Sequence, residues 1–497
     1  MSATVIGIDL GTSAVRVVAI DLQGKIVAQA TRSYPLLTPQ PGWTEQHPTD
    51  WIRASLTALS EVAQQVKAVA AIGLSGQMHG MVALDAEGEV IRPAILWNDQ
   101  RTKAAVAAIE TAIDRNELIQ RTGNPAVTGF QLPKVVWLRQ NEPEAFARTR
   151  HLLLPKDYLG YVLTGNLWTE PSDASGTGCL HLASRQWDRD LLQTLDLPLA
   201  WFPPVIDSRA IAGQLQPMIA AQVHLPAGTP VIAGAGDNAA AAIGLGIGST
   251  RLTQGSLSIG TSGVIFAPIA APQPDPQGRV HLFCHADGGY HLLGVTLAAG
   301  GSLRWYRDQF APQASYEELM QLAAQSPAGA NGVLFLPHLA GERSPYLDPD
   351  ARGAWVNLAL ATQPADLLRA VLEGVAFSLR AAADVVRTIA PIEACLTTGG
   401  GARSRLWLQI FADVLGMKLL RPPAEEGAAY GAALLAGVGA GCFTNLEAAF
   451  ALLPTSGEII QPQTVQSQTT QPQAEYEDGF DRFQRLYAAL KAVGELS

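Results

Sequence analysis

A short pattern occurs twice in this chain, and it constrains the fold more than any other feature. Residues 8–15 read IDLGTSAV, and residues 257–266 read LSIGTSGVIF. In each copy an apolar run leads into Gly-Thr-Ser and a second apolar run follows, which is typical of two strands joined by a tight turn. The repeat predicts a duplicated, β-rich core whose two turns face each other across a cleft and bind phosphate.

The length of the chain agrees with a duplicated architecture. Its 497 residues exceed what one hydrophobic core usually holds. A composition of 48% hydrophobic and 16% charged residues is typical of a well-buried globular protein. The second copy of the pattern begins shortly after residue 245, so we predict one domain over residues 1–245 and another over residues 246–497.

Charge and hydropathy exclude two classes of partner. The formal net charge of −10 leaves no surplus of Lys and Arg to neutralise nucleic-acid phosphates. The N-terminus, MSATVIGIDLG, has no basic segment, and no uninterrupted apolar run is long enough to span a bilayer. We therefore expect a cytoplasmic protein that binds neither nucleic acid nor membrane.

Two aspartates stand beside glycine-rich turns. Residues 231–244 read VIAGAGDNAAAAIG, which predicts a strand, a glycine turn, Asp237 and then a helix. Asp9 precedes Gly11, Thr12 and Ser13, a combination of carboxylate, bare backbone and hydroxyls that suits a metal-bound phosphate. A lone aspartate at a strand end is more often a helix cap than a catalyst, and a single polar turn is more often an ordinary hairpin. The repeated turn at Gly260, Thr261 and Ser262 favours the functional interpretation of both.

Two polar loops, residues 77–80 and 97–101, follow buried runs and read QMHG and WNDQR. They place hydrogen-bonding groups beside an apolar or aromatic surface, as a polyhydroxylated small molecule requires. The candidate contacts are Met78, His79, Trp97, Asn98 and Asp99. On the residues alone, His79 as a structural histidine and Trp97 as a core residue remain open alternatives. We predict structural ion pairs for Lys156, Asp157 and Asp173.

Glycine also marks the second half of the chain. Residues 397–405 read TTGGGARSR between an apolar strand and a helix, so Gly400 and Gly401 let a flat or anionic ligand lie against the backbone. Adenosine is the candidate ligand, and Gly300 lies in a further loop of this kind. Residues 461–473 have no periodicity and predict a surface loop before a terminal amphipathic helix.

Eight segments together carry a family resemblance. They are IDLGTS, GQMHG, LWNDQR, LLPKDYL, GAGDNAAAAIG, LSIGTSGV, LPHLAGERSPYLDP and GGGARS, in this order over nearly the whole chain. The sequence thereby resembles the FGGY family of carbohydrate kinases. The resemblance implies an α/β, actin-like fold in which two similar ribonuclease-H-like domains flank a deep cleft, with sugar mainly on the first domain and ATP mainly on the second.

The resemblance also implies roles for individual residues. Asp237 is expected to be the catalytic base and, with Asp9, to lie on the Mg²⁺ side of the site together with the phosphate-facing turn at residues 11–13. The expected sugar contacts are Met78, His79, Asn98, Asp99, Asp237 and Asn238. The expected nucleotide contacts are Gly260, Thr261, Gly300, Gly400, Gly401 and Arg403, with Ser262 added by the repeated turn.

The activity implied is ATP-dependent phosphorylation of a ketopentose, with ATP and Mg²⁺ required. GQMHG combined with LWNDQR is similar to members that phosphorylate D-xylulose, although Gln100 stands where those members often have Gly. Ribulose, glycerol or another polyol remains an alternative acceptor. An actin-like ATPase switch without a sugar acceptor and a catalytically silent sugar-binding regulator are alternatives of other classes. A homodimer is also left open.

Overall fold

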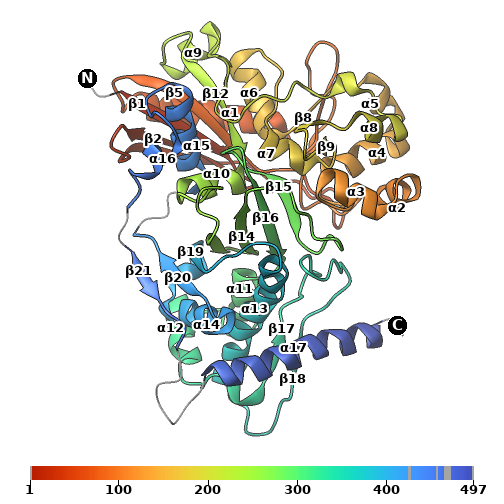
Figure 1. The fold of residues 1–497 in the computed structure, drawn as a ribbon, viewed down its shortest axis with the longest axis vertical. Coiled ribbons are helices and arrows are strands. Elements are labelled where there is room, and N and C mark those ends of the chain that lie inside the picture. The colour runs from red at the N-terminus through yellow and green to blue at the C-terminus, as the bar shows by residue number, and fades with distance from the viewer. Residues whose placement is uncertain (1–2, 424–426, 455–456, 464–471, 495–497) are drawn as a thin grey trace.

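The computed structural model describes residues 3–423, 427–454, 457–463 and 472–494, and its centre consists of two large β-sheets (Figure 1). The first sheet has six strands, whose order across the sheet is β11 (Ile211–Gln214), β12 (Pro230–Gly236), β5 (Val69–Gly76), β1 (Thr4–Leu10), β2 (Ala14–Asp21) and β3 (Ile26–Ser33). β1 is parallel to β5 and antiparallel to β2. Six of the seven β1 residues are buried, as expected for a central strand covered on both faces.

The second sheet repeats this topology. Its order is β15 (His281–Cys284), β16 (Tyr290–Thr296), β14 (Gly263–Ile269), β13 (Gln254–Ile259), β19 (Ala394–Thr398), β20 (Lys418–Arg421) and β21 (Glu458–Ile460). β13 is antiparallel to β14 and parallel to β19, just as β1 is antiparallel to β2 and parallel to β5. The two sheets confirm the duplicated, β-rich core that the sequence repeat predicts.

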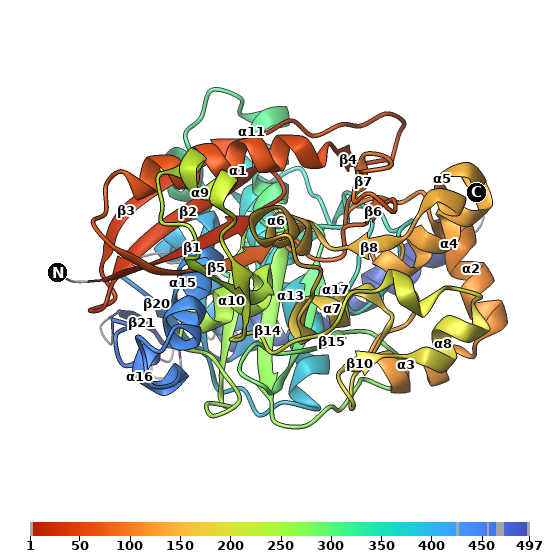
Figure 2. The same cartoon turned by 90° about the horizontal axis from the view of Figure 1, so that it is seen from above.

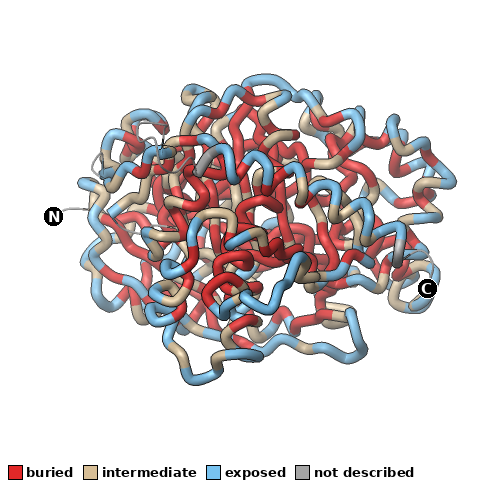
Figure 3. Tube along the Cα trace, turned by 90° about the horizontal axis from the view of Figure 1, so that it is seen from below, coloured by how far each residue is buried: buried red, intermediate tan, exposed pale blue. Residues whose placement is uncertain are grey.

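Helices cover both faces of the first sheet. The helix α1 (Pro48–Ala63) begins with proline in its first turn, where the missing N–H is not needed, and buries Trp51, Leu59 and Val62 against the sheet. The helix α15 (Gly427–Gly439) covers the opposite face (Figure 2). The strands between these helices form the buried interior, and the exposed residues lie mainly on the outer loops and helix faces (Figure 3).

The helix α15 reaches the first sheet from late in the chain, and glycines allow the approach. A Cβ atom at Gly7 on β1 would lie 1.8 Å from the carbonyl oxygen of Ala429. A Cβ atom at Gly431 would lie 1.7 Å from the carbonyl oxygen of Ala240, on α10 (Asp237–Gly244). Only glycine fits such contacts, so these positions lock α15 against β1 and α10.

The remaining elements surround the two sheets. The α-helices are α2 (Lys103–Ala112), α3 (Arg115–Thr122), α4 (Gln131–Asn141), α5 (Pro143–Arg148), α6 (Pro155–Thr164), α7 (Pro171–Ala174), α8 (Arg189–Thr194), α9 (Pro217–Val223), α11 (Gly300–Phe310), α12 (Tyr316–Ala323), α13 (Pro364–Arg387), α14 (Arg405–Leu415), α16 (Leu446–Phe450) and α17 (Pro472–Gly494). The short strand pairs are β4 (Glu45–Gln46) with β7 (Ala94–Ile95), β6 (Val82–Leu84) with β8 (His151–Leu153), β9 (Leu180–His181) with β10 (Gln186–Trp187), and β17 (Leu334–Leu336) with β18 (Ala354–Val356). Short 3₁₀ helices are η1 (Ser175–Thr177), η2 (Leu199–Trp201), η3 (Ala330–Gly332) and η4 (Gly400–Arg403).

Two predictions concern the end of the chain. The terminal amphipathic helix is confirmed as α17, which buries Tyr476, Phe480 and Phe483 against α13 and its neighbours. The predicted loop at residues 461–473 lies in part, at residues 464–471, outside the described residues. Within the described ranges, no helix combines the length and the apolar character needed to cross a bilayer.

Candidate active site

Asp237 is the first residue of α10 and follows β12 directly. The predicted glycine turn is absent as a separate element, because the strand continues through Gly236 to the start of the helix. The backbone N–H and the Nδ2 group of Asn238 both donate to Oδ1 of Asp237, at 2.7 and 2.8 Å. Its other oxygen, Oδ2, has no hydrogen-bond partner in the described chain. One oxygen is thus held while the other is left to accept a proton.

Asp9 lies near Asp237 because of the sheet register. Asp9 on β1 pairs with Ser75 on β5, and Ser75 pairs with Ala235 on β12. Asp237 comes two residues after Ala235, so both aspartates lie at the carboxyl ends of their strands. Those strands, β1 and β12, are roughly 10 Å apart because β5 lies between them. Oδ1 of Asp9 is buried and finds no hydrogen-bond partner among the described residues.

The two carboxyl groups have raised pKa values. Burial raises the pKa of Asp9 to about 6. Burial and then the negative charge of Asp9 raise the pKa of Asp237 to about 7, although Asn238 opposes that rise. A carboxylate with a pKa near neutrality is suited to act as a general base. The two buried carboxylates are also suited to bind a cation, because a positive ion would offset their negative charge.

The turn at residues 11–13 is held by side chains from elsewhere in the first half. Gln46 donates through Nε2 to the carbonyl oxygen of Thr12 at 2.7 Å, and the Tyr34 hydroxyl donates to the carbonyl oxygen of Gly11. Trp97 donates through Nε1 to the Thr12 hydroxyl at 2.9 Å. Trp97 is half-buried rather than core, and it joins one predicted sugar loop to the predicted phosphate turn.

His79 is a buried residue with a left-handed backbone, φ 68°. Its Nδ1 lies 2.6 Å from the carbonyl oxygen of Gly176, and its ring stacks on Phe130 with centroids 4.4 Å apart. Burial lowers the pKa of His79 to about 3, so the ring is neutral at physiological pH. Met78 packs against Gly236, where a Cβ atom would be 2.9 Å from the Cγ atom of Met78. These contacts fix the loop beside Asp237.

The second polar loop is organised by Asp99. Asp99 is fully buried and accepts from the backbone N–H of Thr44 at 2.6 Å and from Nε and Nη2 of Arg101 at 2.9 and 2.7 Å. Asn98 is half-buried, and its Oδ1 accepts from the Thr44 hydroxyl at 2.8 Å. Both oxygens of Asp99 are therefore occupied, while the Nδ2 group of Asn98 has no partner among the described residues.

The predicted ion pairs of Lys156 are confirmed. Its Nζ lies 2.6 Å from Asp157 and 3.7 Å from Asp173, and all three side chains are buried. Glu170, which the sequence reasoning did not include, lies 3.8 Å from the same nitrogen. Glu170 also accepts from the hydroxyl of Ser172, which in turn accepts from the backbone N–H of Gly236 at 3.1 Å. This buried network supports the end of β12 just before Asp237.

Three glycine segments meet at one edge of the second sheet. The backbone N–H groups of Gly300 and Gly301 donate to the carbonyl oxygens of Gly260 and Thr261, at 2.8 and 3.0 Å. A Cβ atom at Gly401 would lie 2.3 Å from a methyl group of Ile259, whereas one at Gly400 would meet nothing within 4 Å. The structure thus brings together most of the residues predicted for nucleotide contact, and leaves open space at Gly400.

The other two residues predicted for nucleotide contact lie close by. Ser262 ends the β13–β14 turn and is half-buried. Arg403 is the last residue of η4, and its carbonyl oxygen accepts from Nη1 of Arg421 at 3.4 Å. Both therefore belong to segments that surround the same sheet edge.

Two basic side chains were missed from the sequence. Lys134 is fully buried on α4, and its Nζ donates to the carbonyl oxygens of His79 and Gly129, at 2.7 and 2.8 Å. A lysine among the buried positions of an otherwise apolar helix face is the signal that would have found it. The other is Arg343, within the GERSP segment of the family resemblance.

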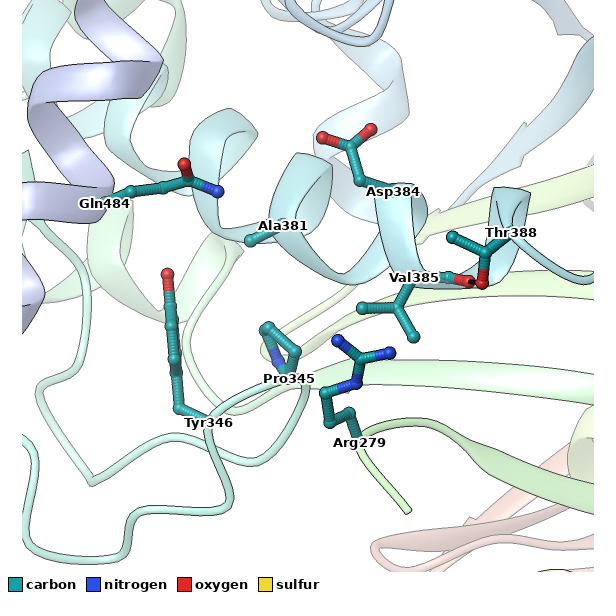
Figure 4. Close-up of a pocket in the computed structure, with 8 residues that line it drawn as sticks. All are labelled: Arg279, Pro345, Tyr346, Ala381, Asp384, Val385, Thr388 and Gln484. Atoms are coloured by element: carbon teal, nitrogen blue, oxygen red, sulfur yellow. Dashed lines mark hydrogen bonds between the residues drawn. The ribbon is translucent and has the colours of Figure 1, made fainter. Parts of the chain in front are cut away.

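A further pocket has a volume of about 510 Å³. Its lining consists of Arg279, Pro345, Tyr346, Ala381, Asp384, Val385, Thr388 and Gln484 (Figure 4). None of the predicted site residues is among them. In the described residues there is also no group of three or more His, Cys, Asp or Glu side chains that could hold a metal ion.

Comparisons with known proteins agree with this arrangement. Residues 4–244 match the N-terminal domain of the FGGY family of carbohydrate kinases, and residues 255–440 match its C-terminal domain. The chain therefore belongs to the FGGY family of carbohydrate kinases, enzymes that transfer a phosphoryl group from ATP to a sugar hydroxyl.

Particular relatives match over almost the whole chain. The xylulose kinase of Bacillus subtilis (strain 168) is 38% identical over 493 residues, which cover 98% of this chain and 97% of that protein. The xylulose kinase of Escherichia coli (strain K12) is 39% identical over 491 residues, 98% of this chain and 99% of that one. A crystal structure of a xyloylose kinase from Brucella ovis matches with a TM-score of 0.91 at 36% identity, over 99% of this chain and 100% of the other. The family resemblance and the actin-like, ribonuclease-H-like fold are confirmed.

Proposed function

We propose that this kinase transfers the γ-phosphoryl group of ATP to the 5-hydroxyl of D-xylulose and releases D-xylulose 5-phosphate and ADP. The acceptor is inferred from relatives named xylulose kinase, which match nearly the full chain at 38% and 39% identity. The observation that carries the mechanism is the state of Asp237, whose Oδ2 has no partner among the described residues and whose pKa is raised to about 7.

The reaction needs one proton acceptor and accurate positioning. The 5-oxygen attacks the γ-phosphorus, the bond between that phosphorus and the bridging oxygen of ADP breaks, and Oδ2 of Asp237 accepts the hydroxyl proton. Asn238 keeps Oδ1 fixed during this step. A positioned general base typically contributes about 10²- to 10⁴-fold, and alignment of the two substrates supplies much of the remainder.

The sugar contacts are assigned to the two loops of the first half. Neutral His79 offers Nε2 to a hydroxyl, and Asn98 offers its amide nitrogen. Met78 and Trp97 provide apolar surface for the carbon skeleton. Asp99 contributes through the loop that it fixes, because both of its oxygens already accept hydrogen bonds from Thr44 and Arg101.

The residues present fit a magnesium ion. Oδ1 of Asp9 is buried without a partner in the described chain, and the negative charge of Asp9 helps to raise the pKa of Asp237. Mg²⁺ is commonly bound by one or two carboxylates together with substrate phosphates and waters. We assign Asp9 and Asp237 as its protein ligands. When bound, the ion neutralises charge on the triphosphate and orients it.

The phosphates and the nucleotide are assigned to the glycine segments. We assign the transferred phosphate to the turn at residues 11–13 through the backbone N–H groups of Thr12 and Ser13, because the N–H of Gly11 donates to the carbonyl oxygen of Ala14 at 3.1 Å. We assign ATP to residues 260–262, Gly300, Gly400, Gly401 and Arg403. In this assignment the domain of residues 1–245 binds sugar and the domain of residues 246–497 binds nucleotide.

Location and assembly are part of the proposal. We assign the enzyme to the cytoplasm, where ATP is available. A homodimer would cover apolar side chains that are exposed in one chain, such as Phe310, Leu358 and Leu360. Light scattering of the purified chain measures its mass directly, and a monomer at micromolar concentration would contradict the dimer.

The acceptor is tested by coupled measurement of ADP release. The purified enzyme is given MgATP and, one at a time, D-xylulose, other pentuloses, hexuloses, glycerol and other polyols. The largest kcat/KM is expected for D-xylulose. A larger kcat/KM for ribulose or glycerol would reassign the acceptor, and ATP turnover unaffected by all of them would instead support an actin-like ATPase.

A further inference from the structure

Arg343 lies in the loop between β17 and β18, and its neighbour Glu342 fixes that loop. Oε1 of Glu342 accepts from the backbone N–H groups of Leu297 and Arg343, both at 2.8 Å. Oε2 accepts from the Ser378 hydroxyl at 2.9 Å and lies 3.0 Å from Nδ1 of His338. The Glu342 carboxylate is therefore fully occupied by groups other than the guanidinium of Arg343.

The guanidinium of Arg343 instead reaches the first half of the chain. A Cβ atom at Gly129 would lie 2.9 Å from Nη2 of Arg343 and 2.3 Å from the carbonyl oxygen of Trp97. Lys134 ties this same segment to the sugar loop, since its Nζ binds the carbonyl oxygens of both Gly129 and His79. Arg343 is thus a residue of the second half placed among groups that form the sugar loops of the first half.

The guanidinium has no partner there. No hydrogen bond or ion pair between described residues involves it. The carboxylate of Asp99, in the second sugar loop, is paired with Arg101. A guanidinium carries five N–H donors, and those of the half-buried Arg343 are left available to a ligand. Burial accordingly lowers the pKa of Arg343 to about 10, which still leaves the group charged at neutral pH.

The order of residues along the site indicates which end of a bound sugar lies near the guanidinium of Arg343. Met78 packs against Gly236, directly before Asp237, and His79 follows Met78. Arg343 lies beyond, beside Gly129 and close enough to His79 for its charge to disfavour protonation of that ring. With the 5-hydroxyl of a ketopentose at Asp237, the opposite end of the sugar, its 1-hydroxyl and 2-carbonyl, points toward Arg343.

We propose that Arg343 donates hydrogen bonds to the oxygens at the C1–C2 end of the acceptor sugar. This rests on the proposed function for the direction of the sugar. The acceptor is then held by residues of both halves of the chain, with Asp237 at one end of the sugar and Arg343 at the other. A bound sugar therefore stabilises the close approach of the second half to the first.

The test compares Arg343→Met with a matched control, Arg352→Met, an exposed arginine on the same loop whose guanidinium bonds only to nearby carbonyl oxygens. Arg343→Met is expected to raise KM for D-xylulose roughly 10- to 100-fold, with KM for ATP and the melting temperature nearly unchanged. Arg352→Met is expected to match the wild type in all three. An unchanged sugar KM in Arg343→Met would overturn the assignment.

A second measurement separates sugar contact from a purely structural role. The 1-deoxy analogue of D-xylulose lacks the 1-hydroxyl, so the wild type is expected to use it less efficiently than D-xylulose, and Arg343→Met is expected to lose that preference. A preference of equal size in both proteins would contradict the contact. Arg343→Lys keeps the charge, and we expect it to restore only part of the preference because the planar donor pair is lost.

The outcome is distinguishable from failure of the proposed function. If the wild type prefers another ketose, D-xylulose as the acceptor is wrong, and the same comparison is made with that ketose and its 1-deoxy analogue. The Arg343 proposal is then tested by comparing the preference for that ketose over its 1-deoxy analogue in the wild type and in Arg343→Met.

Discussion

The hairpin β1–β2 and the hairpin β13–β14 have the same pattern and the same place in their sheets, yet one aligned position carries a charge in the first hairpin alone. The strand before the first turn carries Asp9, and the strand before the second carries Ser258. Both residues are half-buried at corresponding positions. One supersecondary unit is thus used twice, once with a carboxylate and once with a neutral hydroxyl.

The difference separates two tasks. Beside the first turn, Asp9 and Asp237 concentrate negative charge, which suits a cation and a base. Beside the second turn, Gly300 and Gly301 lie against the backbone of Gly260 and Thr261, and the pattern there contains no carboxylate. We therefore assign proton transfer and the metal to the first half, and the anionic nucleotide to the second half, where Gly400 leaves open space.

The largest expected effect comes from removing the base. Asp237→Asn should lower kcat about 10²- to 10⁴-fold, because Oδ2 no longer accepts the proton. Sugar and ATP binding, measured by calorimetry, should change little, and the exposed Asp308→Asn serves as the control. Turnover near the wild-type value would remove Asp237 from the mechanism.

The next effect tests the carboxylate of the first hairpin. Asp9→Asn should lower kcat roughly 100-fold at low Mg²⁺, since one proposed metal ligand is neutralised. Excess Mg²⁺ should restore part of the loss, as measured by kcat over a Mg²⁺ titration. A titration midpoint equal to that of the wild type would show that Asp9 does not serve the ion.

The raised pKa of Asp237 predicts a pH dependence. The base acts deprotonated, so kcat/KM for the sugar should be constant above pH 7 and fall about tenfold per pH unit below the pKa of about 7. Because the charge of Asp9 contributes to that pKa, the residual activity of Asp9→Asn should have its acidic limb at lower pH. Identical limbs in both proteins would mean that the two carboxyl groups are not coupled.

The smallest expected effect comes from making the second hairpin resemble the first. Ser258→Asp places a carboxylate where we assign nucleotide, and KM for ATP should rise roughly 3- to 10-fold through repulsion of the phosphates. KM for D-xylulose should remain the same, with Ser258→Asn as the neutral control. A lower KM for ATP in Ser258→Asp would reverse the division of tasks between the hairpins.

The sequence was most informative where a pattern is local. The Gly-Thr-Ser turns, the start of α1 at Pro48 and the ion pair of Lys156 with Asp157 follow from neighbouring residues, and the structure has them. What was missed depends on contacts between distant segments. The helix pattern marks Lys134 as a buried lysine, but it does not reveal that Lys134 contacts His79 or that Arg343 lies beside Gly129. The packing of α15 on β1 likewise requires Gly7 and Ala429 to meet, which local composition does not indicate.

The central claim is that the two hairpins serve one phosphoryl transfer to a sugar. Its most direct test is the stoichiometry of the reaction, with ADP measured by a coupled assay and the sugar phosphate by phosphorus NMR. The account predicts one D-xylulose phosphorylated at its 5-hydroxyl for each ADP formed, and little ADP without sugar. ADP formed at the same rate with and without sugar, and no sugar phosphate, would contradict it.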